Sequence, residues 1–249
     1  MGPLAYAEYV PEDEPLLAAR ANAADLGGTE PVLPEVGATL RFLACAVGAR
    51  TAVEIGTGCG SSGIWLLRGM RPGSTLTSVD TEPEYHRMAR KAFTLAGFAQ
   101  NQCRLILGRA LDVLPRLSDG AYDMVFCDAD VRDYPDYLTA ALRLLRPGGV
   151  VAFNNALLAG TGLGDGPGAG VLGGALGGAG LLDGADGGGL LNGAEGGGLL
   201  DGADGGEFDD PDFPEGEADL ATQVRSDDRL VPVLLPLGYG LLAALKKGD

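Results

Sequence analysis

Hydrophobic and polar positions follow two alternating patterns between residues 31 and 155. Short apolar runs predict strands, and segments with apolar residues at helical spacing predict helices. The predicted strands are 51–55, 75–79, 104–107, 122–127 and 150–153, and the predicted helices are 35–47, 61–70, 84–96, 110–117 and 134–145. This alternation predicts an α/β fold with a parallel, doubly wound sheet. In such a sheet a ligand binds beyond the carboxyl ends of the strands.

The pattern changes towards both ends of the chain. A helix is expected at 14–24, within an N-terminal helical extension over residues 1–30, and another is expected at 215–225. Residues 230–237 and 239–245 are short β-like runs joined around Gly238 and Gly240. They predict an antiparallel hairpin that closes the sheet.

Residues 160–206 interrupt the fold pattern with a segment in which about half the residues are glycine. It contains a nine-residue repeat, GLLDGADGG, GLLNGAEGG and GLLDGADGG. A calcium-binding β-roll has the repeat G-G-x-G-x-D-x-U-x. In the register that begins at Gly187, Leu190 stands where this repeat has its next glycine, so the match fails. We therefore expect a Gly-rich, acidic, disordered insertion at 160–206, which divides one domain into residues 31–159 and 207–249.

Composition excludes several classes of partner. The 249-residue chain has 18 Lys and Arg against 34 Asp and Glu, and the resulting net charge of -16 argues against nucleic acid. No apolar run approaches the roughly 18 residues of a membrane span. The N-terminal residues 1–7 lack the features of a signal peptide. The four cysteines show no C-x-x-C spacing, so we expect a reduced, cytoplasmic protein.

The most informative motif is the glycine-rich run at 53–63, where a predicted strand meets a predicted helix. A strand, a tight glycine turn and a helix N-terminus together form a nucleotide site. Residues 58–63 fit the dinucleotide pattern G-x-G-x-x-G, whereas Glu54, Gly56, Gly58 and Gly60 fit E-x-G-x-G-x-G. An acid ahead of the first glycine repels a pyrophosphate but suits a cation, which favours S-adenosylmethionine (SAM).

Asp80 ends the second predicted strand, 26 residues after Glu54. A carboxylate at this point can accept hydrogen bonds from both ribose hydroxyls of a nucleoside. The sequence from Asp80 to Pro83 is also a good start signal for a helix, so a capping role stays open.

Several motifs in the same order resemble one known family. They are VEIGTGCGSSGIWLL, TSVDTEPEY, LGRALDVLPRL, YDMVFCDAD and LRLLRPGGVVAFNNALLAG, and the C-terminal DDRLVPVLLPLGYGLLAALKK. The chain resembles the catechol-type O-methyltransferases, methyltransferase family 3, and especially their actinobacterial members. The resemblance covers roughly residues 30–158 and 207–247. It implies a seven-stranded Rossmann-like sheet with an antiparallel last strand, SAM as methyl donor and a homodimer.

The resemblance also implies the residues that hold the methionine part of SAM. Glu54 and the backbone of Gly56 and Thr57 would face this part, and Ser62 would hold its carboxylate. The helix N-terminus at Ser62 would assist in binding that negative charge.

Five further residues are placed at the site by the same resemblance. Asp80 would bind the ribose, Ala110 would line the adenine pocket, and Val32 would belong to a segment that covers SAM. Asp128 would lie between the SAM ammonium group and the acceptor, and Asp130 would also contact the cofactor.

The chain departs from the metal-dependent members of this family. Those enzymes read D-x-x-K after strand four and D-N after strand five, whereas here Val131 replaces the lysine and Asn154 precedes Asn155. Since Mg²⁺ prefers charged oxygen ligands, we assign no metal ligands and expect weak or no dependence on Mg²⁺. The lone histidine, His86, is expected at the surface or as a cap, which leaves Asp128 as the candidate base.

We therefore predict an enzyme that transfers a methyl group from SAM to a small hydroxylated acceptor resembling a phenol or catechol, with S-adenosylhomocysteine (SAH) as product. The absence of the lysine and of the second aspartate leaves open a SAM-binding protein without catalysis. The G-x-G-x-x-G pattern also leaves open a nicotinamide-dependent oxidoreductase.

Overall fold

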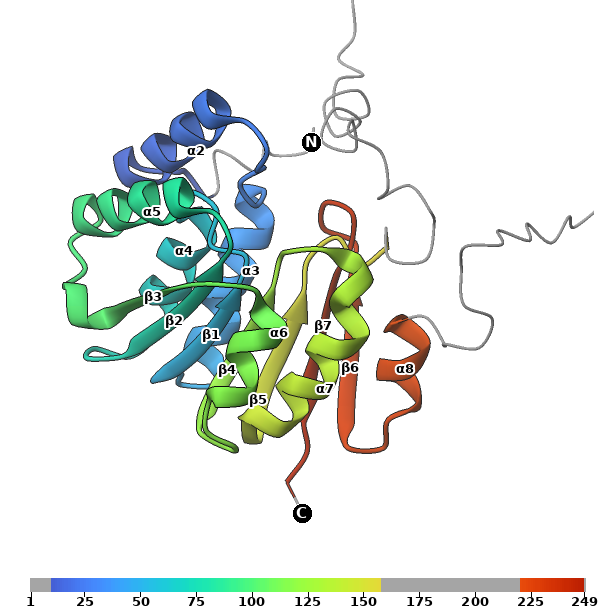
Figure 1. The fold of residues 1–249 in the computed structure, drawn as a ribbon. Coiled ribbons are helices and arrows are strands. Elements are labelled where there is room, and N and C mark those ends of the chain that lie inside the picture. The colour runs from blue at the N-terminus through green and yellow to red at the C-terminus, as the bar shows by residue number, and fades with distance from the viewer. Residues whose placement is uncertain (1–9, 158–219, 249) are drawn as a thin grey trace, which may run out of the picture. The chain divides into compact units, whose positions relative to one another are not determined.

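One mixed sheet carries the fold of the part of the chain that the structure describes. The computed structural model describes residues 10–157 and 220–248. Within them, the sheet has seven strands in the order β3-β2-β1-β4-β5-β7-β6 (Figure 1). The strands are β1 Thr51–Ile55, β2 Thr75–Asp80, β3 Cys103–Leu107, β4 Tyr122–Cys127, β5 Leu145–Phe153, β6 Leu230–Leu235 and β7 Leu241–Lys246.

The direction of each strand agrees with the hydrophobic pattern. Strands β1 to β5 pair in parallel, whereas β7 runs antiparallel to both β5 and β6. The predicted doubly wound sheet and its C-terminal antiparallel hairpin are therefore confirmed. The switch in strand order lies between β1 and β4, and it leaves a crevice at their carboxyl ends.

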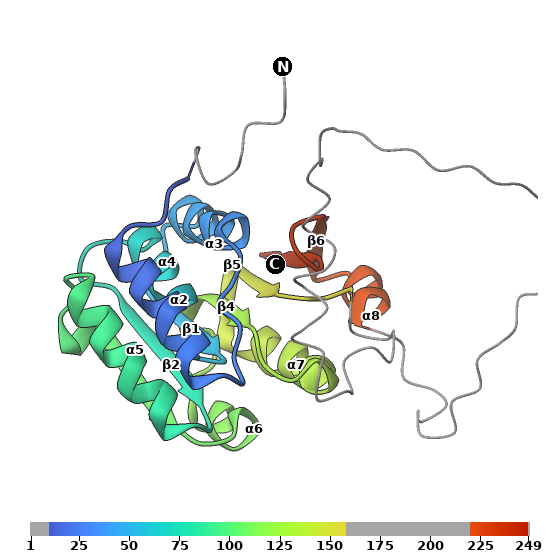
Figure 2. The ribbon, with the colours of Figure 1, turned by 90° about the horizontal axis from the view of Figure 1, so that it is seen from above.

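Helices cover both faces of this sheet (Figure 2). They are α2 Glu14–Leu26, α3 Pro34–Ala46, α4 Ser61–Gly69, α5 Pro83–Leu95, α6 Ala110–Val113, α7 Tyr134–Leu144 and α8 Leu220–Ser226. Helices α2 to α5 pack their apolar residues into one core cluster, and α6 to α8 pack theirs into a second cluster on the other face. Trp65 of α4 is buried in the first cluster, as expected of a packing residue.

Two boundaries of the described elements differ from the sequence prediction by more than two residues. The helix expected at 110–117 ends at Val113, and a 3₁₀ turn at Leu114–Arg116, which carries a proline, continues the chain. Strand β5 begins at Leu145 rather than at residue 150, because Leu145 already pairs with Tyr122 of β4. Gly148 has a left-handed backbone, with φ 76°, and the β4–β5 register shifts in this region.

The N-terminal helix α2 is part of the main core. Its Leu16 and Ala19 are fully buried in the first cluster, and Arg68 of α4 bonds Asp13 at its start. The disorder expected at 160–206 falls on residues 158–219, which lie outside the described part. Residues 215–219 of the helix expected at 215–225 also lie outside it, and the rest of that helix is found as α8. Within the described part, no helix combines the length and apolarity that a membrane crossing requires.

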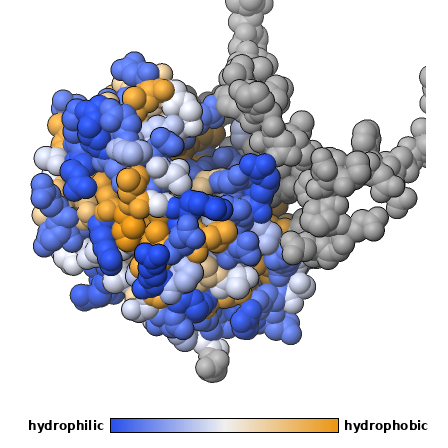
Figure 3. Space-filling view, in the orientation of Figure 1, coloured by the Kyte–Doolittle hydropathy of each residue, from blue (hydrophilic) through white to orange (hydrophobic). Residues whose placement is uncertain are grey.

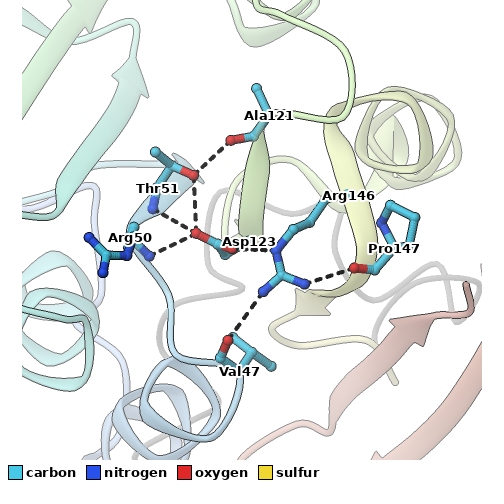
Figure 4. A network of polar contacts seen from close by, with 7 residues as sticks. All are labelled: Val47, Arg50, Thr51, Ala121, Asp123, Arg146 and Pro147. Atoms are coloured by element: carbon cyan, nitrogen blue, oxygen red, sulfur yellow. Dashed lines mark hydrogen bonds and ion pairs between the residues drawn. The ribbon is translucent and has the colours of Figure 1, made fainter.

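A buried carboxylate joins four segments at the amino end of the sheet (Figure 4). Oδ2 of Asp123 accepts hydrogen bonds from the backbone N–H groups of Arg50 and Thr51, at 2.7 and 2.9 Å. Its Oδ1 accepts from Nε of Arg146 at 2.5 Å, and the same guanidinium reaches the carbonyl oxygen of Val47. This network ties β1, β4, β5 and the end of α3 together far from the carboxyl edge.

Candidate active site

A cavity of about 540 Å³ opens at the carboxyl edge of the sheet. The ends of β1, β2 and β4 form its floor with Ile55, Val79 and Asp128. Its volume falls in the range of pockets that enclose a small molecule or cofactor. The topology therefore places the cavity where an open α/β sheet binds its ligand.

The glycine-rich loop after β1 forms one wall of the cavity. Gly56, Gly58 and Gly60 all have positive φ values, of 94°, 48° and 94°. A Cβ on Gly56 would collide with the backbone carbonyl oxygen of Asp128, so this position accepts no side chain. Helix α4 begins directly after Gly60, so its N-terminus lies at the cavity wall.

Two serines of that first turn line the cavity. Ser61 and Ser62 are 4% and 5% exposed, and both belong to the cavity wall. The Ser61 hydroxyl has no hydrogen-bond partner among the described residues. A buried hydroxyl without a partner costs free energy, which a polar ligand at the helix N-terminus would offset.

Asp80 binds backbone groups of two neighbouring segments. Its Oδ2 accepts from the backbone N–H groups of Thr57 and Gly58 at 2.9 and 3.0 Å, and its Oδ1 accepts from Glu82 N at 3.0 Å. It thus fixes the glycine loop and the start of α5, whose N-cap is Glu82 rather than Asp80. Asp80 also lines the cavity, so ribose binding stays a prediction.

Glu54 lies beneath the cavity and does not line it. Its side chain is fully buried, and its Oε2 accepts from Ser78 Oγ at 2.5 Å. Ser78 Oγ in turn lies 2.7 Å from the hydroxyl of Thr57, which does line the cavity. Burial raises the pKa of the Glu54 carboxyl to about 8, and the Ser78 bond opposes this shift only in part.

Asp128 lies directly after β4 with its carboxyl group at the cavity. Its backbone N–H bonds Ile55 O at 2.8 Å, which fixes it beside the end of β1. Its Oδ1 accepts from the side-chain amide of Asn154 at 2.9 Å. Desolvation raises the pKa of Asp128 to about 6, while the bond from Asn154 lowers it. Such a carboxylate is a competent proton acceptor near neutral pH.

The segment after β5 is held rigidly around Asn154. Tyr134 of α7 donates its hydroxyl hydrogen bond to the Asn154 carbonyl oxygen at 2.8 Å, and Tyr134 is fully buried. Asn155 adopts φ 53° and lines the cavity. The N–H groups of Ala156 and Leu157 then bond the carbonyl oxygens of Gly240 and Tyr239. The segment after β5 and the segment before β7, which are far apart in the chain, thus form one wall of the cavity with Asn155 and Tyr239.

The structure brings most of the predicted site residues together. The cavity wall contains Val32, Gly56, Thr57, Ser62, Asp80, Ala110, Asp128 and Asp130. Asp130 is partly exposed and pairs with Arg132 at 2.7 Å. The prediction for His86 is wrong in one respect, because this residue is buried in α5 with 9% exposure rather than lying at the surface.

Several residues of the cavity wall were not predicted from the sequence. Among them are Thr29, Tyr85 and Tyr239. Tyr85 could have been found from its place five residues after Asp80, within the first turns of the following helix. Thr29 and Tyr239 carry no local signal, because tertiary packing alone brings their loops to the sheet edge.

The residues at 128, 154 and 155 fit a Mg²⁺ ion poorly. They comprise one carboxylate and two amides, and the amide nitrogen of Asn154 is directed at Asp128. Among the described residues, no group of three or more His, Cys, Asp or Glu side chains could hold a metal ion. We therefore derive no chemical step through a metal.

Comparison with known proteins assigns the family. The model of a family described as O-methyltransferase matches residues 4–169. A curated protein of Mycobacterium sp. strain KMS, provisionally assigned as an O-methyltransferase, is 41% identical over 244 residues, covering 98% of this chain and 91% of its own. The chain belongs to the O-methyltransferase family. A similar protein of Mycolicibacterium vanbaalenii is 40% identical over 242 residues, covering 97% and 88% of the two chains.

Solved structures of O-methyltransferases share the fold. TomG from Streptomyces achromogenes, an O-methyltransferase involved in tomaymycin synthesis and solved with SAM, is 27% identical with a TM-score of 0.69, covering 98% of this chain and 94% of its own. Cofactor-bound Rv0187 is 26% identical with a TM-score of 0.67, covering 98% and 95%. This O-methyltransferase is therefore a SAM-dependent enzyme, and the nicotinamide alternative is rejected.

The cavity of this O-methyltransferase fits that cofactor. The side-chain-free loop at Gly56, the unpartnered Ser61 hydroxyl at the start of α4 and the acids Asp80 and Asp128 suit a ligand with a carboxylate, hydroxyls and a cationic group. When bound, SAM supplies an electrophilic methyl group on a sulfonium sulfur.

Proposed function

We propose that the enzyme methylates the hydroxyl group of a small phenol- or catechol-like acceptor within this cavity, without needing a metal. The observation that carries the proposal is Asp128, which lines the cavity and whose carboxyl group accepts a hydrogen bond from Asn154 and has a pKa raised to about 6. Asp128 would accept the acceptor's hydroxyl proton, while bound SAM would supply the methyl group to that oxygen, with its S–CH₃ bond breaking to leave SAH. The remaining catalysis comes from positioning of the reactants.

We assign the two ends of the cofactor to different walls. Gly56, Thr57 and Ser62 hold its methionine part, and Glu54 supports them from below through Ser78 and Thr57. Asp80 binds the ribose, and Ala110 and Val32 enclose the adenosine. This assignment is supported by the position of each residue at or directly under the cavity. Asp130 lies on the same wall beside Asp128.

The acceptor part of the cavity is bounded by residues that follow β4 and β5. Tyr137, Asn155 and Tyr239 line the cavity together with Asp128. Their aromatic rings and amide group suit a planar, hydroxylated molecule.

Titration calorimetry with SAM and SAH, followed by turnover on a panel of phenols and catechols in the presence of EDTA, tests the proposal. We expect binding of both ligands and methylation of at least one acceptor, with less than about a twofold effect of EDTA. Tight binding without any turnover would instead support a SAM-binding protein that lacks catalysis. Activity abolished by EDTA and restored by Mg²⁺ would contradict the metal-independent mechanism.

We further propose that the enzyme is a homodimer of the cytoplasm. Val231 and Leu245 are register partners at the β6–β7 edge and are 52% and 39% exposed, and Val233 on the same sheet face is 47% exposed. An apolar edge of this kind favours burial against a second copy. Figure 3 shows hydrophobic residues among hydrophilic ones on the face seen in Figure 1. Light scattering after size exclusion tests the dimer.

All four cysteines are free thiols, which favours a reducing compartment such as the cytoplasm.

A further inference from the structure

A short strap beside the cavity connects α2 to α3. We define the strap as residues 28–32, all of which line the cavity. One end is fixed by Arg20 of α2, whose guanidinium donates to the Val32 carbonyl oxygen at 2.9 Å. The same guanidinium pairs with Glu12 at 2.8 Å, so the anchor itself is held in place.

The other end of the strap is fixed by a tyrosine of α5. The Tyr85 hydroxyl donates a hydrogen bond to the Gly27 carbonyl oxygen at 3.0 Å. Tyr85 also lines the cavity, only five residues after Asp80. Asp80 in turn binds the start of α5 through Glu82 N at 3.0 Å. The strap is thus joined, through Tyr85, to the wall assigned to the ribose.

The backbone at this end is adapted to the tyrosine. Gly27 and Gly28 both have left-handed backbones, with φ 67° and 72°, which turn the chain sharply out of α2. A Cβ on Gly28 would lie only 2.8 Å from the Tyr85 hydroxyl oxygen. Further along, Thr29 Oγ1 would lie 3.0 Å from a Cβ on Gly58, so the strap also approaches the glycine loop closely.

We infer that Tyr85 is a positioning residue for the cofactor, whose hydroxyl holds the strap closed over the cavity and slows the release of SAM and SAH. The inference rests on the proposed location of the cofactor in this cavity. Its basis is that Arg20 and Tyr85 fix opposite ends of the strap, while Gly27 and Gly28 allow the Tyr85 end to turn. If the Tyr85–Gly27 bond is broken, the strap loses one of these two anchors and keeps only the anchor at Val32.

The variant Tyr85→Phe removes the hydroxyl oxygen and keeps the ring. We expect the SAH dissociation rate to rise about three- to tenfold, with a matching rise in Kd, as for the loss of one hydrogen bond. Amide hydrogen exchange at residues 27–32 should accelerate in the SAH complex. The melting temperature of the ligand-free protein should stay close to that of the wild type. Tyr122→Phe, on β4 and outside the cavity wall, is the matched control and should change none of these values.

A double-mutant cycle with Gly28→Ala sharpens the test. The added methyl group collides with the Tyr85 hydroxyl, so part of its effect on SAH release should disappear in the Tyr85→Phe background. SAH release and strap exchange that are unchanged in Tyr85→Phe would overturn the inference. Failure of the wild type to bind SAH would instead overturn the proposed function on which it rests.

Discussion

Two aspartates at opposite ends of β4 are in contrasting environments. Asp123, near the amino end, accepts two backbone N–H bonds and one from Arg146. Burial raises its pKa, but these donors outweigh burial, so the pKa of Asp123 is lowered overall. Asp128, just beyond the carboxyl end, receives one side-chain bond, and burial raises its pKa to about 6.

The contrast indicates that Asp123 serves the stability of the fold, whereas Asp128, just beyond the other end of β4, serves the site. At the amino end, the buried Asp123 carboxylate accepts hydrogen bonds from donors of the protein itself, which favours the folded state. At the carboxyl edge, Glu54 Oε1 and the Ser61 hydroxyl have no partner among residues 10–157 and 220–248. Of these two, only the Ser61 hydroxyl lines the cavity. A site that must bind a polar ligand keeps a group of this kind unsatisfied until the ligand arrives, at some cost in stability.

The largest effect should follow from Asp128→Asn. This change keeps the shape of the side chain but removes its ability to accept a proton, so we expect kcat to fall by about 10²- to 10⁴-fold. SAH affinity should change far less, and the free energy of unfolding should not decrease. Steady-state kinetics and calorimetry measure these quantities.

The matched control for this variant is Asp136→Asn on the exposed side of α7. It removes a carboxylate outside the cavity wall and should leave kcat unchanged. If Asp128→Asn retained more than about a tenth of wild-type kcat, Asp128 would not be the base.

The next effect concerns the amino end. Asp123→Ala leaves the buried N–H groups of Arg50 and Thr51 without their acceptor, so we expect the free energy of unfolding to fall by roughly 2–3 kcal/mol. Because Arg146 is partly exposed, its contribution to this loss is small. Urea unfolding measures the change. Under conditions where the variant is folded, SAH affinity should equal that of the wild type.

Asp119→Ala provides a comparison for Asp123→Ala. Asp119 also pairs with an arginine, Arg143, but its side chain is 73% exposed. We expect a loss of less than about 1 kcal/mol. Equal losses in the two variants would mean that burial at Asp123 has no special importance.

A further effect should come from Glu54→Gln and should depend on pH. The pKa of Glu54 is about 8 in the folded state against 4.5 in its ordinary state, so between these values the folded protein binds more protons than the unfolded one. Stability therefore falls as pH rises from about 5 to 8. Each pKa unit corresponds to about 1.4 kcal/mol, so removing this titration should flatten the profile by at least about 1 kcal/mol.

Urea unfolding of ligand-free protein at several pH values between 5 and 8 measures that difference. The wild type and Glu54→Gln should diverge most at the two ends of this range. Parallel profiles would show that Glu54 does not titrate there and that its unpaired oxygen is satisfied in solution.

The sequence predicted most of the fold because periodicity reports directly on burial. Strands 51–55 and 122–127 were predicted at their observed bounds, whereas β5 began earlier than expected, because its pairing with Tyr122 overrides the local Pro-Gly-Gly signal. The predicted cofactor residues mostly meet at one cavity, since the carboxyl ends of parallel strands share one edge. Thr29 and Tyr239 could not be foreseen from a local pattern, because their loops reach the cavity through contacts with distant residues.

The pairing of Ala156 and Leu157 with Gly240 and Tyr239 has a consequence for engineering the enzyme. These bonds join backbone atoms only, so they tolerate a change of side chain at position 239. Position 155 is more restricted, because φ 53° is accessible mainly to Asn, Asp and Gly. A saturation library at residue 239 should therefore alter the shape of the acceptor wall while leaving the sheet and the cofactor loop intact.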